Sequence, residues 1–285
     1  MNARLVNARK ALRGAIELRR HAKIPKTTPI CIYDVIENLG IDVRFVGEKS
    51  FGGMYSKSTN TILVPALRPI GRQAFTCAHE LGHWYFGHGT RLDDLKTMEA
   101  KCDCDPEEQI ANLFAGYFLA PSWTVEKTFS DRNWTPERCS AIEIYTVAVQ
   151  LGMGYTSLIQ HLRSPLELIS TKCANELSKI TPKEIRSQIL NNSSIEYLVI
   201  VDKSWKGIPI DLRVGDAVLL PADATIEGNT ITITNKHNRG LIANAHCPGI
   251  SRVATPDSWA SFIRVSKKGF VGRSIYRHLE DPDVD

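Results

Sequence analysis

The chain has 285 residues, of which 43% are hydrophobic and 23% charged, as is ordinary for a globular protein. This length allows one large domain or two to three smaller ones, each with its own core. No apolar run approaches the roughly 18 residues of a membrane helix, and the stretch MNARLVNARKALRGAIELRR is charged where a signal peptide must be apolar. Seven scattered cysteines suit free thiols in a reducing compartment. We therefore expect a cytoplasmic protein with no membrane partner.

The net charge of +4 is unevenly distributed along the chain. Residues 1–26 contain eight Lys or Arg and a single acid, Glu17, which leaves 27 basic and 30 acidic residues elsewhere. One interpretation is a contact with nucleic acid, although no aromatic side chains are interleaved with these charges. The other is the solvated face of an amphipathic helix whose apolar side carries Leu5, Ala8, Leu12 and Ile16.

The first half of the chain alternates predicted helices and short strands. A helix over residues 2–23 stops near Pro25, and a second helix ends at Gly40, before the strand IDVRFV. GGMYS and NTILVP are short strands around the polar turn KSTN. Beyond them, IGRQAFTCAHELGHWYFGH is helical, a polar loop covers residues 89–104, and DPEEQIANLFAGYFLAP is a further helix.

The second half of the chain is predicted to be helical at first and rich in β-strands afterwards. Residues 135–164 are predicted to form two helices broken at GMG, either as a helix-turn-helix or as a plain helical hairpin that packs on the core. After about residue 195 the chain is β-rich, and TIEGNTIT indicates a hairpin that turns at Gly228–Asn229. We accordingly divide the chain into residues 1–130, a helical (helix-turn-helix-like) segment and connector over 131–192, and residues 193–285.

The stretch FTCAHELGHWYFGH carries the strongest chemical signal. Positions i and i+4 of a helix differ by about 40° around its axis, so His79 and His83 project to one side and can bind one Zn²⁺. Glu80 is rotated by about 100° from His79, so it flanks the ion and can take a proton from metal-bound water. The alternative is a pair of core histidines beside a surface glutamate.

The third ligand must come from elsewhere in the chain. A metzincin would place a histidine where Gly89 stands, and His88 lies about 140° from His83 around the same helix. A glutamate from a later helix is the remaining source, and the chain offers Glu99, Glu107, Glu108 and Glu126.

Glu108 is the best placed of these glutamates, because it shares a helical face with Ala111 and Ala115, small residues that would let two helices approach closely. The face of Glu107 is bulkier. However, Asp105 and Pro106 are typical of a helix start, where Glu108 would merely reach back to the cap. The residues alone leave both interpretations open.

Together, AFTCAHELGHWYFGH and EEQIANLFAGYFLAP resemble the ImmA/IrrE family of zinc metallopeptidases, and similar segments begin near residue 30. The resemblance implies that Glu108 is the third zinc ligand. Ile110 stands where the family commonly has an acid or Gln, which leaves Glu107 as a substitute. The implied fold is α+β: a mostly helical zincin-like metallopeptidase domain with a small β-sheet over residues 1–130, then a β-rich, GAF-like regulatory domain over 193–285.

The resemblance also implies a function: a zinc-dependent endopeptidase that cleaves a helix-turn-helix transcriptional repressor and so induces a stress or defence operon. Single-stranded DNA or a small ligand would be the activating signal. The alternative is a non-catalytic, metal-containing regulator or antitoxin-like binding protein. The intact Glu80 favours the enzyme, because a metal scaffold alone would not require an acid there.

Two further features bear on peptide cleavage. Cys102 and Cys104 lie in the loop between the ligand helices, where a thiolate would replace the metal-bound water and inhibit the enzyme, or where both are inert surface thiols. The segment MYSKSTNTILVP is either an exposed edge strand that binds substrate by strand addition or an ordinary hairpin.

Overall fold

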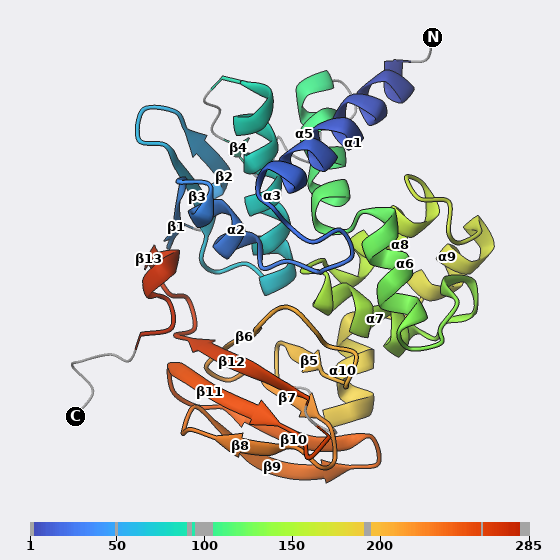
Figure 1. Ribbon diagram of the computed structural model, residues 1–285, viewed down its shortest axis with the longest axis vertical. Helices are drawn as coiled ribbons and strands as arrows, with labels where there is room; N and C mark the ends of the chain where they lie inside the picture. The colour runs from blue at the N-terminus through green and yellow to red at the C-terminus, as the bar shows by residue number, and fades with distance from the viewer. Residues whose placement is uncertain are drawn as a thin grey trace.

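The structure is a computed structural model that describes residues 3–48, 51–89, 93–94, 105–190, 195–257 and 259–279. Its upper part combines helices with one sheet, and its lower part consists of two facing sheets (Figure 1). The expected α+β fold, helical first and β-rich afterwards, is therefore confirmed. The GAF-like character of the β-rich part and the three-part division of the chain stay predictions.

The upper sheet has five strands in the order β13-β1-β3-β2-β4. Strands β1 (Asp42–Val46) and β3 (Thr61–Pro65) are parallel, and β2 (Phe51–Ser56) runs antiparallel to β3. One end of β2 also pairs with the short β4 (Asp93–Asp94). Strand β13 (Gly272–Arg273) returns from far along the chain to pair with β1.

Helix α3 (Ile70–Phe86) is central to the upper part, because it contacts β2 and β3 on one side and α5 (Pro106–Leu119) on the other. An unbroken run from Thr76 to His83 is buried. Three more helices surround this pair: α1 (Ala3–His21), which packs on α5, α2 (Ile32–Asn38), which packs on α3, and α6 (Ser122–Ser130), which follows α5.

The apolar face expected for α1 is correct for Leu12, which packs against the core, but wrong for Leu5 and Ile16. The helix buries Ala11, Ala15 and Leu18, whereas Leu5 and Ile16 are 46% and 38% exposed. Small residues determine this choice, because they allow a close approach between helices. A Cβ atom on Gly14, on the same side, would lie 2.7 Å from the rings of Tyr85 and Phe86 at the end of α3.

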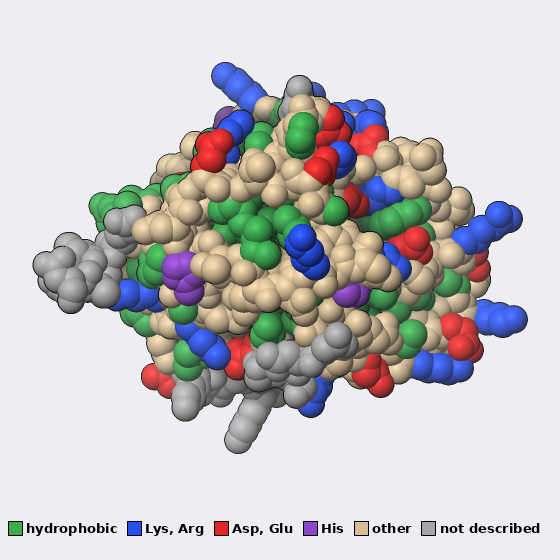
Figure 2. Space-filling view, turned by 90° about the horizontal axis from the view of Figure 1, so that it is seen from below, with side chains coloured by type: hydrophobic (Ala, Val, Ile, Leu, Met, Phe, Trp, Pro, Cys, Tyr) green, Lys and Arg blue, Asp and Glu red, His purple; other side chains and the backbone are tan. Residues whose placement is uncertain are grey.

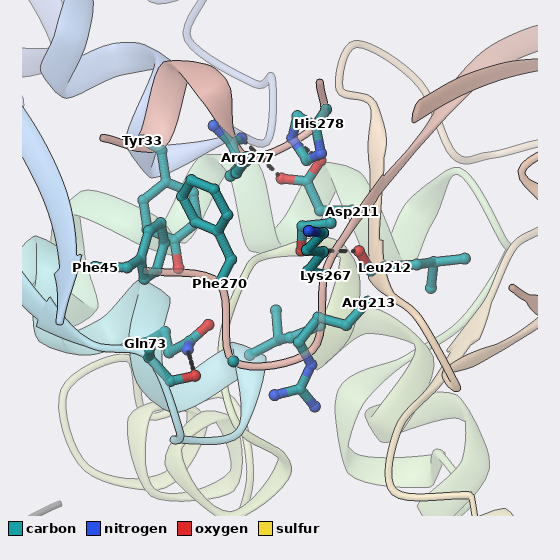
Figure 3. Close-up of a pocket in the computed structure, with 14 residues that line it drawn as sticks. Tyr33, Phe45, Gln73, Asp211, Leu212, Arg213, Lys267, Phe270, Arg277 and His278 are labelled. Carbon is teal, nitrogen blue, oxygen red and sulfur yellow. Dashed lines mark hydrogen bonds and ion pairs between the residues drawn. The ribbon is translucent and has the colours of Figure 1, made fainter. Parts of the chain in front are cut away.

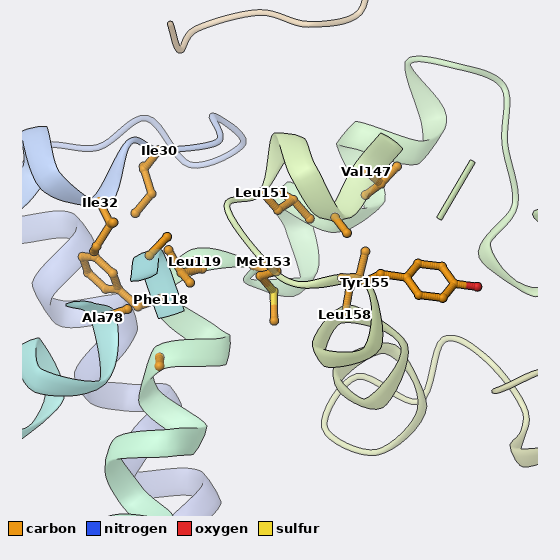
Figure 4. Close-up of a cluster of buried hydrophobic side chains, with 14 of the residues drawn as sticks. Ile30, Ile32, Ala78, Phe118, Leu119, Val147, Leu151, Met153, Tyr155 and Leu158 are labelled. Carbon is orange, nitrogen blue, oxygen red and sulfur yellow. The ribbon is translucent and has the colours of Figure 1, made fainter. Parts of the chain in front are cut away.

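The two helices predicted around GMG form a buried helical hairpin. Helix α7 (Ala141–Gln150) begins at a capping box made by Ser140 and Glu143, and α8 (Tyr155–Arg163) follows Gly152, whose φ of +68° only glycine adopts readily. Their apolar side chains join those of α3 and α5 in one core (Figure 4). The short η1 (Pro136–Arg138) precedes them, and α9 (Thr171–Ser178) and α10 (Pro182–Leu190) follow.

The β-rich part consists of two four-stranded sheets that face each other, in the orders β5-β7-β10-β9 and β6-β12-β11-β8. Apolar side chains from both sheets fill the space between them. The strands are β5 (Leu198–Ile200), β6 (Ile210–Arg213), β7 (Ala217–Leu220), β8 (Thr225–Glu227), β9 (Ile231–His237), β10 (Gly240–Ala245), β11 (Gly249–Ala254) and β12 (Ala260–Ser266).

Strands β5 and β7 are buried on both of their faces. Along β7, Val218 and Leu220 point into the space between the sheets, whereas Ala217 and Leu219 belong to the core of the helices. The hydroxyl of Tyr145 on α7 also donates a hydrogen bond to the carbonyl of Leu198 in β5. Burial on both faces explains why these strands are apolar without alternation.

The hairpin predicted at TIEGNTIT is wrong. Strand β8 pairs with β11 in one sheet and β9 pairs with β10 in the other. Gly228, at φ +119°, carries the chain from one sheet to the other, and a Cβ atom there would clash with Ser251. The local turn signal was correct, but the strands that it joins find partners elsewhere.

Charges of both signs are interspersed over the lower face of the β-rich part, around a small apolar patch (Figure 2). Within the described residues, no helix is long and apolar enough to cross a membrane.

A cluster of charged side chains joins the β-rich part to the helices. Asp211 on β6 accepts hydrogen bonds from Arg264 on β12, at 2.6 and 2.9 Å, and from Arg277, at 3.2 Å. Arg277 follows η2 (Ser274–Tyr276) and lies directly over Asp211 (Figure 3). Both guanidiniums also pair with Asp34 on α2, which packs against α3. The cluster therefore links the two sheets to the central helix through α2.

Replacing Asp211 with Asn should destabilise the protein, because Arg264 and Arg277 would keep their charges with less compensation. Removing one partner of a buried ion pair costs about 3–5 kcal/mol, and the partial exposure of Asp211 reduces our expectation to about 2 kcal/mol. Urea unfolding measures the change. Asp257→Asn, which alters an exposed pair with Lys203, is the matched control and should shift the midpoint far less.

The effect should depend on pH in a defined direction. Burial alone would raise the pKa of Asp211, but Arg277 and Arg264 outweigh it and hold the pKa well below its usual range. Because the pKa is lower in the folded chain, this stabilisation is present above the unfolded value of about 3.9 and is lost as the pH falls below it. Wild type and Asp211→Asn should therefore converge in acid; an unchanged difference would contradict this account.

Candidate metal centre

Helix α3 places the side chains of His79 and His83 on one side, as the spacing of four residues predicts. Both are almost fully buried, at 0% and 3% exposure, under the neighbouring helix α5. Their Nε2 atoms point toward each other at a separation of 3.0 Å. Two imidazole nitrogens are therefore brought together inside the protein, between the two helices.

A close contact between helices brings the third group to this point. Gly82 of α3 lies against Ala111 of α5 so tightly that a Cβ atom on Gly82 would lie 3.2 Å from the Cα atom of Ala111. Glu108 lies one turn before Ala111 on the same helix. Its carboxylate oxygens are 3.3 Å from the Nε2 atom of His79 and 3.4 Å from that of His83. The small residues expected to allow this approach are thus at the contact.

The start of α5 accommodates both the cap and the cluster. Asp105 caps the helix by accepting a hydrogen bond from the backbone N–H of Glu107 at 2.9 Å. The carboxylate of Glu108, which the cap interpretation would send back to the start of the helix, instead points to the two histidines.

The distances fit a metal ion. Four-coordinate Zn²⁺ with bonds of about 2.0–2.1 Å separates its ligand atoms by roughly 3.3 Å. The three separations in the cluster are 3.0, 3.3 and 3.4 Å. Among the described residues, His79, His83 and Glu108 form the group of metal-binding side chains whose ligand atoms converge in this way.

The same contacts determine the charge of Glu108. Its burial alone would raise the pKa of the carboxyl group. Hydrogen bonds and charge interactions with His79 and His83 outweigh burial and hold the pKa well below its usual range. Glu108 is therefore a carboxylate, as a metal ligand must be.

Each histidine is also held from behind by a second hydrogen bond. The Nδ1 atom of His79 lies 3.0 Å from the Oδ1 atom of Asn112, one turn beyond Glu108 on α5. The Nδ1 atom of His83 lies 3.0 Å from the Nδ1 atom of His88. Such partners fix the orientation of a ligand imidazole and the nitrogen that carries its proton.

His88 does not occupy the position that a continued helix would give it. Helix α3 ends at Phe86, and Gly87, at φ +69°, turns the chain so that His88 folds back over His83. The sequence interpretation treated the helix as intact through this residue and so missed the contact. The available signal was a glycine just before a polar residue, which is typical of a helix end.

Glu80 lies beside the cluster and beneath strand β2. It is 2% exposed, and a Cβ atom on Gly53 of β2 would lie 2.7 Å from its Oε1 atom and 2.6 Å from the Cγ2 atom of Thr76. Only glycine allows the strand to pass so close to this carboxylate. The sequence suggested a substrate-binding strand here but not the reason for its glycine.

The remaining predicted residues do not join the cluster or cannot be placed. Glu126 is exposed on α6, and Glu107 is half-buried at the start of α5. Glu99, Cys102 and Cys104 lie outside the described residues. Strands β2 and β3 form an ordinary antiparallel hairpin, and the outer side of β2 pairs with β4 near Gly53.

Comparison with known proteins identifies the class. Residues 36–163 match the family model Peptidase_M78, described as the IrrE N-terminal-like domain. This range begins in α2 and contains α3, α5 and the helical hairpin. The matched segment is thus a metallopeptidase domain, and the match confirms the resemblance to the ImmA/IrrE family over these residues. No curated protein matches the chain.

The ligand assignment can be tested by metal analysis of paired variants. Glu108→Ala should lose stoichiometric zinc, because the two imidazoles alone leave the ion with too few protein ligands. Glu107→Ala, which changes the adjacent glutamate of the same helical turn, should retain it. Retention of zinc by Glu108→Ala together with its loss from Glu107→Ala would reverse the assignment.

Proposed function

We propose that the protein is a zinc-dependent endopeptidase in which His79, His83 and Glu108 hold the metal and Glu80 is the general base. One observation carries the proposal: three ligand atoms converge at a buried point, and the carboxylate of Glu80 is buried on the same helix. The metal would supply acidification of a bound water and polarisation of the substrate carbonyl. The donor set of two imidazoles and a carboxylate supports zinc as this metal.

The side chains of the chain itself supply the proton transfers. Glu80 takes a proton from the attacking water and returns it to the amine that leaves when the peptide C–N bond breaks. Strand β2 covers Glu80, because its Gly53 passes directly over this carboxylate, and at this point the strand pairs with β4 on its outer side. The hydrogen bond from His79 to Asn112 holds the imidazole of His79 in the orientation that a metal ligand needs.

The proposed substrate is a helix-turn-helix transcriptional repressor, whose cleavage induces a stress or defence operon. The family match supports this choice. The β-rich part would receive the activating signal, a small ligand or single-stranded DNA. The cluster of Asp211, Arg264 and Asp34 supports such control, because it connects that part to α2 and hence to α3.

A second candidate is a non-catalytic, metal-containing regulator or antitoxin-like protein. It shares the metal ligands, so metal binding alone does not separate the two functions. Glu80 is buried beside the cluster, under strand β2, where residue 53 must be glycine. This burial favours the enzyme. A scaffold that only holds metal gains nothing from this costly arrangement.

Glu80→Gln distinguishes enzyme from scaffold. The amide is nearly the same size but cannot accept a proton, so zinc content should remain and peptidase activity should fall by about 10²-fold or more. The assay incubates each variant with a helix-turn-helix repressor from a neighbouring gene, the proposed substrate, and follows fragments by mass spectrometry. Equal cleavage by wild type and Glu80→Gln would remove Glu80 from the mechanism.

The same assay tests the kind of substrate. We expect cleavage at one or a few bonds in an exposed linker of a folded repressor, and slow turnover of an unfolded chain such as casein. The reason is the family match together with the burial of Glu80 and of the three proposed ligands. Rapid cleavage of casein at many sites would contradict this specificity.

A further inference from the structure

His88 lies just beyond the helix that carries the histidine pair, and the proposed mechanism gives it no task. It is 8% exposed, and its backbone N–H donates to the carbonyl of His83 at 3.0 Å. Its ring lies edge-on to that of His83, with centroids 5.0 Å apart, and stacks on the ring of Phe86. These contacts fix the imidazole in a single place, with its Nδ1 atom directed at the Nδ1 atom of His83.

The hydrogen bond between the two Nδ1 atoms can run in either direction, and only one direction suits a metal. If His88 donates, then a neutral His83 carries its proton on Nε2, the atom that faces His79 and Glu108. That nitrogen would then have no lone pair for an ion. If His83 donates from Nδ1, its Nε2 lone pair points into the cluster, ready for coordination.

His79 has a partner of the same kind. The Oδ1 atom of Asn112 accepts a hydrogen bond from the Nδ1–H group of His79, and the unprotonated Nε2 atom of His79 then faces the cluster. One acceptor comes from α5 and the other from the turn after α3. Both histidines are thus held in the tautomer that carries its proton on Nδ1, by residues that lie outside the cluster.

We propose that His88 is a positioning residue that accepts a hydrogen bond from the Nδ1–H group of His83 and so leaves the lone pair of the opposite nitrogen available for a metal ion. This inference rests on the proposed metal site but not on peptidase activity. His88 acts through His83, because His83 lies between it and the cluster. Gly87 contributes to this arrangement, because its left-handed backbone conformation turns the chain so that His88 lies over His83.

Two replacements separate this role from simple packing. His88→Phe keeps a ring that can stack on Phe86 but removes the acceptor, whereas His88→Gln keeps an acceptor but removes the ring. The positioning role predicts that His88→Phe weakens zinc affinity about 10–100-fold, the usual cost of losing such a partner, and that His88→Gln recovers most of it. A packing role predicts the opposite order.

Zinc affinity is measured on the full chain by competition with a chromogenic chelator at constant pH, and the unfolding midpoint of the metal-free protein is recorded for each variant. His246→Phe and His246→Gln, which change an exposed histidine of the β-rich part, are matched controls and should bind zinc as wild type does.

Loss of affinity in His88→Phe with a wild-type unfolding midpoint, and recovery in His88→Gln, would support the inference. Wild-type zinc affinity in His88→Phe would overturn it, as would a loss of affinity that follows the loss of stability in both variants. If wild type itself binds no zinc, the proposed function fails, and this result is distinct from a failure of His88 alone.

Discussion

The contact between Gly82 and Ala111 is the constraint on which the rest of the site depends. A helix normally keeps its neighbour 8–10 Å away, according to the side chains at the contact. Here one partner has no side chain and the other has only a methyl group, so α3 and α5 approach closely enough for Glu108 to reach both histidines. A larger residue at either position would separate the helices. His79, His83 and Glu108 would then be buried without their hydrogen-bonding partners, which costs more free energy than an ordinary loss of packing.

The two helices also carry the supports of the cluster, so the geometry is set by a few rigid elements and not by loops. Asn112 lies one turn from Glu108, His88 lies immediately after α3, and Gly53 admits β2 to within contact of Glu80. Each of these residues restricts the conformations of the side chain that it contacts. A site arranged in this way is ready for its ion before binding, because little reorganisation remains.

Local patterns predicted much of this, and long-range packing explains what they missed. The spacing of His79 and His83 follows from helical geometry, and most helices and strands were found where periodicity placed them. The sequence left Glu108 between two roles, because its neighbours fit a helix start and a ligand equally well. Gly87 was read as part of a helix, Gly228 as the turn of a hairpin, and Leu5 and Ile16 of α1 as part of its buried face. In each case the missing information was the identity of the packing partner, which local sequence does not contain.

Strand β13 has a consequence for the timing of folding. It pairs with β1, although more than 220 residues separate the two strands and every other described strand is synthesised before it. A contact between residues so far apart in the sequence forms late, because closing a long loop costs conformational entropy before the strand pairing can offset that cost. During synthesis the edge of β1 therefore stays unpaired until β13, which contains Arg273, has been made. In the same way, Asp34 on α2 cannot form its ion pair with Arg277 until that residue has been made. The order of synthesis thus delays completion of the peptidase domain until the ribosome has passed the β-rich part.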